Sequence, residues 1–157
     1  MQGTGSQLVI RDGRGASDAP ALVRIRRTVV TSTHHFLRPG DLEKIEARMA
    51  TDYLPSVTVL VAERDTIPLG FAGIADDRLE MLFVSDTAHG RGVGSALLGE
   101  AVARFGVTHV DVNEQNETAR RFYRRRGFVA VGRSASDAEG RPYPMLHLEL
   151  TVEPPRR

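Results

Sequence analysis

The sequence predicts a mixed α/β fold in which a mostly antiparallel sheet of about seven strands carries helices on both faces. Three observations lead to this prediction. Short β-branched runs alternate with longer segments whose apolar residues recur every three or four positions. Two neighbouring runs are separated only by a polar turn at residues 63–68, which is typical of an antiparallel hairpin. The chain has 157 residues, enough for one hydrophobic core, so we expect a single domain over residues 8–153, with loose ends at 1–7 and 154–157.

The expected elements follow the order β-α-α-β-β-β-α-β-α-β-β. Pro39 and Gly40 interrupt the helical pattern between the first two helices, and Asp41 is expected to N-cap the second. Gly127 is expected to C-cap the last helix. Strands are expected, in chain order, at residues 8–11, 57–62, 69–75, 79–84, 107–112, 128–132 and 146–152. Helices are expected at residues 18–36, 41–49, 93–105 and 117–126.

The composition argues against several classes of protein. The formal net charge is +1, too small to indicate a nucleic-acid partner. The chain has no cysteine, so disulfides, thiolate metal ligands and a thiol nucleophile are excluded. No apolar run approaches the roughly 18 residues needed to span a bilayer, so no membrane association is expected. Residues 1–6 lack the basic and apolar parts of a secretion signal, and a cytoplasmic location is expected by default.

A glycine-rich loop at residues 89–94 separates a predicted strand from a predicted helix. Glycines at such a junction let backbone N–H groups gather around an anion, and the helix N-terminus adds about half a positive charge. Arg91 supplies a further charged donor. The loop therefore predicts a site for a pyrophosphate. A tight turn that merely needs glycine is the plainer interpretation of the same residues.

Two other phosphate-binding loops compete with this interpretation. A P-loop ends in Gly-Lys-Ser or Gly-Lys-Thr, whereas this loop continues with Gly94, Ser95 and an alanine. A dinucleotide-binding loop needs G-x-G-x-x-G, and Ser95 occupies the position of its last glycine. Asp111, about 20 residues downstream, does fit that fold, but the loop lies too far along the chain for a doubly wound sheet to follow.

Two blocks of residues resemble the GNAT superfamily of acetyltransferases. Residues 82–98 are similar to the family's cofactor motif Q/R-x-x-G-x-G/A, with Gly92 and Gly94 as its glycines and His89 where Gln or Arg is usual. Residues 113–128 resemble the family's second block, N-x-x-A-x-x-F/L-Y-x-x-x-G-F. The resemblance extends over nearly all of the chain after residue 8, and it points to a subgroup of small stand-alone bacterial members.

The resemblance implies a GNAT fold and an acetyl-CoA-dependent N-acetyltransferase without a metal. An amine would attack the thioester directly in a ternary complex, with a backbone amide of residues 82–84 stabilising the oxyanion. Asn116 would contact the cofactor near the thioester, and Tyr123 would protonate the departing thiolate. The backbones of Leu82, Phe83 and Val84 would pair with the pantetheine arm, and the pyrophosphate would be held by amides of His89, Gly90, Arg91, Gly92, Val93, Gly94 and Ser95.

The general base has two candidates. Glu80 alternates with Leu82 and Val84, so the three side chains are expected on one face of the strand, where a carboxylate could reach a bound amine through water. His34 lies in a Thr-His-x-Phe-Leu stretch that resembles the acceptor side of the family. A solvated glutamate at the start of a strand and a histidine that caps a helix end are the ordinary alternatives. A tyrosine at the edge of the core is likewise the ordinary alternative for Tyr123.

The resemblance leaves the acceptor open between a small-molecule amine, such as a polyamine or an antibiotic, and a protein amine. A homodimer also stays open, since many domains of this family dimerise. Two alternatives come from other classes of protein, namely a CoA-binding sensor without transfer activity and a dinucleotide-binding module. The arginines at residues 120–126 lie on the polar face of a predicted helix, where a solvated surface is the simpler interpretation than a nucleic-acid patch.

Overall fold

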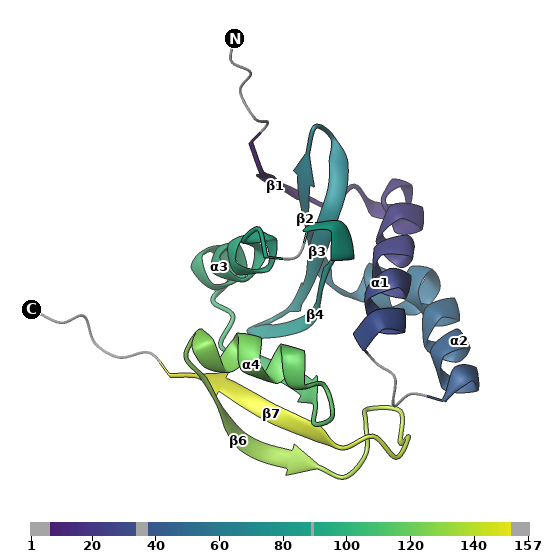
Figure 1. The fold of residues 1–157 in the computed structure, drawn as a ribbon, viewed down its shortest axis with the longest axis vertical. Coiled ribbons are helices and arrows are strands. Elements are labelled where there is room, and N and C mark those ends of the chain that lie inside the picture. Colours follow the sequence, from purple (N-terminus) through teal and green to yellow (C-terminus); the bar gives the residue numbers. More distant parts are fainter. Residues whose placement is uncertain (1–6, 34–37, 89, 152–157) are drawn as a thin grey trace, which may run out of the picture. The chain divides into compact units, whose positions relative to one another are not determined.

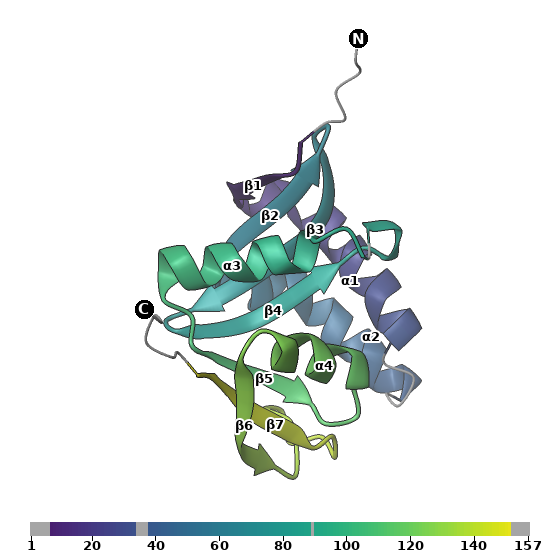
Figure 2. The ribbon, with the colours of Figure 1, turned by 60° about the vertical axis from the view of Figure 1, so that its left-hand side comes forward.

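The computed structural model describes residues 7–33, 38–88 and 90–151. Within these residues, seven strands and four α-helices follow one another in the predicted order (Figures 1 and 2). The mixed α/β class is therefore confirmed. The chain forms two compact units, Met1–Val107 and Thr108–Arg157.

The first unit contains an antiparallel sheet of four strands in the order β1-β2-β3-β4. The hairpin between β2 and β3 is confirmed, but its turn is shorter than predicted. Glu63 pairs with Pro68, and the turn is made by Asp65 and Thr66, with φ angles of 55° and 65°. Left-handed residues at both centres match the twist of the flanking strands, so a polar stretch that appeared to be all turn is mostly strand. The four strands are β1 (Val9–Asp12), β2 (Thr58–Arg64), β3 (Ile67–Ala75) and β4 (Arg78–Val84).

Helices α1 (Ala19–Thr33) and α3 (Val93–Phe105) pack against opposite faces of this sheet (Figure 1). Phe71 of β3 belongs to the core cluster that contains Leu22, Ile25 and Val29 of α1. Its neighbour Gly70 faces α3, because a Cβ at Gly70 would lie 3.2 Å from Val93 Cγ1 and 3.3 Å from Leu97 Cδ1. Adjacent strand residues point to opposite faces, so the prediction of helices on both faces is confirmed in this unit.

Helix α2 (Pro39–Arg48) begins earlier than predicted. Its N-cap is Arg38, and Asp41 lies inside the first turn, so the prediction that Asp41 is the N-cap is wrong. Proline suits the first helical position because its φ is already helical and its missing N–H has no partner there. A turn of π-helix (Met49–Tyr53) and a 3₁₀ turn (Leu54–Ser56), neither of them predicted, lead from α2 into β2.

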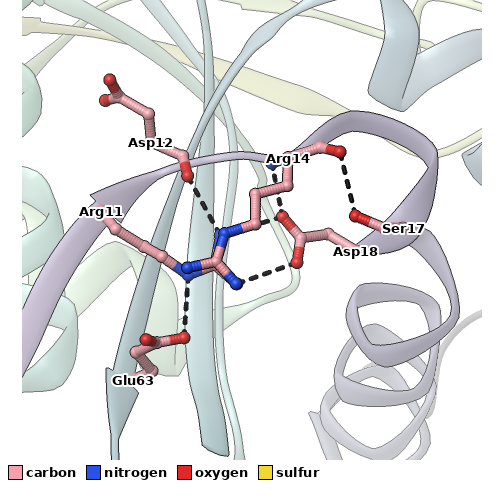
Figure 3. Close-up of polar contacts among 6 residues, drawn as sticks. All are labelled: Arg11, Asp12, Arg14, Ser17, Asp18 and Glu63. Atoms are coloured by element: carbon pink, nitrogen blue, oxygen red, sulfur yellow. Dashed lines mark hydrogen bonds and ion pairs between the residues drawn. The ribbon is translucent and has the colours of Figure 1, made fainter. Parts of the chain in front are cut away.

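A network of charged side chains joins the start of α1 to the sheet (Figure 3). Arg11 of β1 donates to both carboxylate oxygens of Asp18, at 3.1 and 2.8 Å, and its Nε donates to Glu63 Oε2 of β2 at 2.8 Å. The backbone N–H of Arg14 also donates to Asp18 Oδ2, at 2.7 Å. The side chains of Arg11 and Asp18 are only 13% and 10% exposed. The hydrogen bonds from Arg11 hold the pKa of Asp18 below its usual value.

Replacing Asp18 with Asn should lower the free energy of unfolding by about 2 kcal/mol at pH 7, because the nearly buried Arg11 would lose one of its two charged partners. The lowered pKa fixes the pH dependence of this effect. The pKa of an aspartate in the unfolded chain is about 4, and above this pH the stabilisation by Asp18 is fully present. The stabilisation is lost as the pH falls through the lower pKa that Asp18 has in the folded protein. Urea unfolding at several pH values should therefore show the two proteins converging in acid. Asp12→Asn is the control, since the Asp12 side chain pairs with Arg104 while 71% exposed. A loss at pH 7 no larger than that of the control would contradict this account.

The second unit contains three antiparallel strands in the order β5-β7-β6, with α4 packed on β6 (Figure 2). The side chain of Asn116 caps α4 by accepting the N–H of Ala119 at 3.1 Å. At the other end, Arg126 is the C-cap and Gly127, predicted in that role, is the left-handed residue that follows, with φ of 93°. The elements are β5 (His109–Asn113), α4 (Glu117–Arg125), β6 (Phe128–Ser134) and β7 (Met145–Leu150).

Candidate active site

The loop that enters α3 is shaped by two left-handed glycines. Gly90 and Gly92 both have a φ of 79°, and Gly92 is the N-cap of the helix. A Cβ built at either position would meet no atom within 4 Å, so the space beside the loop is open. No acidic residue lies in the first turn of α3. The first N–H groups of a helix have no acceptor inside it, so this loop can surround an anion with backbone donors and a favourable dipole.

A β-bulge interrupts β4 at Glu80. Leu79 pairs with Ile74 and Met81 pairs with Gly73, which leaves Glu80 as the extra residue of that ladder. The Glu80 side chain is 42% exposed and lies 4.0 Å from Arg78 Nε. The strict alternation that predicted a shared face for Glu80 and Leu82 therefore does not hold across the bulge. Bulges redirect side chains and are frequent beside active sites. Beyond the bulge, residues 82–84 are all partly exposed.

Tyr123 lies in the second unit and is 6% exposed. Its ring meets those of Phe122 and Phe128 edge-on, with centroid distances of 5.1 and 5.6 Å. Burial raises the pKa of Tyr123 above its usual value, so the phenol is protonated at neutral pH. Among the residues that the structure describes, none forms a hydrogen bond with this hydroxyl group. Tyr123 is thus an aromatic residue at the edge of the core whose phenol keeps its proton.

The structure does not test every predicted site residue. His34 and His89 lie outside the described residues. The side-chain oxygen of Asn116 caps α4, so a contact between Asn116 and the cofactor stays a prediction. No group of His, Cys, Asp or Glu side chains suited to a metal ion occurs in the described part of the chain. None of the helices in the described ranges is long and apolar enough to cross a bilayer.

Sequence reasoning missed one buried charged residue, Arg26 of α1. It is 6% exposed, and its guanidinium carbon lies 5.8 Å from the centroid of the Phe83 ring. Arg26 stands four residues after Leu22 and four before Val30, both buried, so it occupies the inner face of the helix. The spacing from Leu22 and Val30 indicates a buried position, whereas the charge of an arginine side chain favours the solvent-exposed face of a helix.

A comparison with known families gives the class of this protein. Residues 27–148 match the family described as "Acetyltransferase (GNAT) domain". The chain therefore belongs to the GNAT acetyltransferases, and it is an acyltransferase. This match confirms the resemblance drawn from the glycine loop and from the block that ends at Phe128.

Within the family, the chain is similar to proteins called YjaB. It is 35% identical over 128 residues to the peptidyl-lysine N-acetyltransferase YjaB of Salmonella typhimurium, covering 81% of this chain and 88% of that protein. The solution structure of apo-form YjaB from Escherichia coli matches with a TM-score of 0.84 at 32% identity, covering 94% of this chain and 99% of the other. The structure of yncA from Salmonella typhimurium with its cofactor acetyl-CoA matches with a TM-score of 0.62, covering 97% and 98% of the two chains. Its identity of 21% shows the shared fold alone.

Proposed function

We propose that the protein transfers the acetyl group of acetyl-CoA to the side-chain amine of a lysine in a polypeptide. The observation that carries the cofactor assignment is the open glycine loop before α3, where left-handed backbone and a helix N-terminus suit a pyrophosphate. Lysine as the acceptor is supported by the name of the YjaB relatives, peptidyl-lysine N-acetyltransferase. Family membership leaves no support for the dinucleotide-binding alternative.

The residues of the first unit would bind and orient the two substrates. Backbone N–H groups of residues 89–95 would hold the pyrophosphate, and the backbone of residues 82–84 would pair with the pantetheine arm as an added strand does. An N–H of the same strand would stabilise the oxyanion of the tetrahedral intermediate. Glu80, placed at the bulge and exposed to solvent, would accept the amine proton through a water molecule.

Tyr123 of the second unit would act on the sulfur of the leaving group. Its raised pKa lies far above that of a thiol, about 8.5, so full proton transfer to the thiolate is unfavourable. A neutral phenol can still donate a hydrogen bond to the thiolate as negative charge develops there. We therefore assign Tyr123 as a hydrogen-bond donor whose effect falls at the low end of general acid catalysis.

The kinetic mechanism, ternary complex or covalent intermediate, tests this proposal. With no cysteine in the chain, no thiol can carry the acetyl group between two half-reactions. Initial rates measured against acetyl-CoA at several fixed concentrations of a lysine peptide should therefore give intersecting lines, as a ternary complex requires. Parallel lines would show a covalent intermediate and would contradict direct attack.

The identity of the base is tested by two matched variants. If Glu80 relays the proton, Glu80→Gln should flatten the acid limb of the profile of kcat/KM against pH while acetyl-CoA affinity stays unchanged, because the loop before α3 is intact. His34→Gln should then keep a normal acid limb and serve as the control. The reverse result would assign the base to His34. Normal acid limbs in both variants would exclude both residues and indicate that the amine arrives already neutral.

A further inference from the structure

Arg26 is buried without a hydrogen-bond partner for part of its guanidinium group. Its Nη1 atom is inaccessible to solvent and, among the described residues, is the one buried side-chain nitrogen or oxygen with no partner. Buried guanidinium groups in folded proteins are nearly always paired, because desolvating an isolated charge costs stability. An orphaned donor of this kind needs an explanation.

The acidic residue whose charge acts on Arg26 is Glu46 of α2, and it is already bonded to another arginine. Glu46 Oε2 accepts a hydrogen bond from Arg27 Nε at 2.5 Å. Burial lowers the pKa of Arg26, and the electrostatic interactions with Glu46 and Tyr53 oppose that effect only in part. Arg26 is therefore a buried cation that forms no ion pair with the residues that the structure describes.

The position of Arg26 relates it to the substrates. Its guanidinium group lies over the ring of Phe83, one of the β4 residues proposed to hold the pantetheine arm. Phe83 and Tyr53 lie close to Arg26 and are only partly buried, so a carboxylate would reach the guanidinium group by displacing these side chains. The phosphates of the cofactor are expected at the N-terminus of α3, on the opposite face of the sheet. The counter-charge for Arg26 should therefore come from the other substrate, the acceptor.

We propose that Arg26 binds a carboxylate that the acceptor carries close to its reactive amine. This inference rests on the proposed function, and in a polypeptide acceptor it means an Asp or Glu side chain next to the acetylated lysine. A guanidinium group suits this role because its planar fork of N–H donors matches a carboxylate in two parallel hydrogen bonds. Ligand binding would then complete the pairing that the free protein lacks.

Matched acceptor peptides test the assignment. One peptide carries Glu beside a single lysine, and the other carries Gln at the same position. The native protein should acetylate the Glu peptide with a kcat/KM about ten- to a hundredfold higher, which is typical of one charged hydrogen-bonded contact. Arg26→Met should bring this ratio close to one, whereas Arg24→Met, a change at an exposed position of the same helix, should leave it unchanged. Free lysine and lysinamide form a second pair, which differs only in the α-carboxylate. If the native protein prefers free lysine but does not distinguish the two peptides, the carboxylate that Arg26 binds belongs to a small amino acid.

Thermal unfolding of the variants separates binding from a structural role. Because Arg26 is an unpaired buried charge, an apolar side chain of similar length should leave the melting temperature unchanged or raise it. A fall of several degrees in Arg26→Met, or equal kcat/KM for the Glu and Gln peptides in the native protein, would overturn the assignment. Acetylation of both peptides at equal rates would leave the proposed function standing, whereas no acetylation of any peptide would overturn the proposed function itself.

Discussion

Gly92→Val should abolish the stabilisation of the protein by acetyl-CoA. A ligand at 100 times its dissociation constant stabilises the folded state by about 2.7 kcal/mol, and the native protein should show this gain in thermal unfolding. Gly92 has open space beside it, where the pyrophosphate is expected. A branched side chain would fill that space and would also disfavour the left-handed backbone that aims the N–H groups. The melting temperature of Gly92→Val should therefore not respond to acetyl-CoA.

Gly106→Val is the matched control for this experiment. Gly106 follows the other end of α3, has a φ of 68° and also has no atom within 4 Å of a built Cβ. Both substitutions place valine in the left-handed region, at a cost of roughly 1–2 kcal/mol each, so the two variants should lose similar stability without ligand. Only Gly106→Val should regain it with acetyl-CoA. An equal response of both variants would show that the loop before α3 does not hold the cofactor.

Tyr123→Phe should lower kcat by roughly 10²-fold with little change in KM for acetyl-CoA, because the hydroxyl group acts mainly on the charge that develops in the transition state. The aromatic contacts with Phe122 and Phe128 involve the ring, which phenylalanine keeps. No described residue bonds to the hydroxyl group, so the melting temperature should hardly move. Steady-state kinetics and thermal unfolding of the same preparation check both parts.

Phe122→Leu provides the structural comparison for Tyr123→Phe. It removes one of the two edge-on ring contacts of Tyr123 and keeps the hydroxyl group. Its main effect should therefore fall on the melting temperature rather than on kcat. An unchanged kcat in Tyr123→Phe, or the same loss of kcat in both variants, would show that the phenol takes no part in the reaction.

The parts of this protein that could be predicted from its sequence are those with strong local signals. Gly92 and Gly127 mark helix ends by a conformation that glycine tolerates best, and the apolar spacing of α3 fits no other element. The turn of Asp65 and Thr66 is harder to predict from the sequence, because neither residue is a glycine although both adopt positive φ. The length of this turn is set by the register in which β2 pairs with β3. The sequence of one strand alone does not indicate that register.

The features of the site that escaped prediction depend on contacts between distant residues. The bulge at Glu80 arises from the register of β4 against β3, so alternation within β4 could not indicate it. The burial of Arg26 depends on the packing of α1 against Phe83. Asp41 has the right side chain for an N-cap, but Pro39 already starts the helix. At Glu80 and Arg26 a local preference was overruled by tertiary structure, whereas at the start of α2 one local signal outweighed another.

Mass spectrometry of an amine panel incubated with acetyl-CoA tests the central claim most directly. The panel should hold a lysine peptide with a blocked N-terminus, the same peptide with its lysine blocked and its N-terminus free, a polyamine and an aminoglycoside. We expect the protein to add one acetyl group to the lysine peptide, and we expect fragmentation to place that group on the side-chain nitrogen. The Gly92→Val variant should give no product. Binding of acetyl-CoA without an acetylated product from any amine would contradict transfer, and a product from the polyamine alone would contradict lysine as the acceptor.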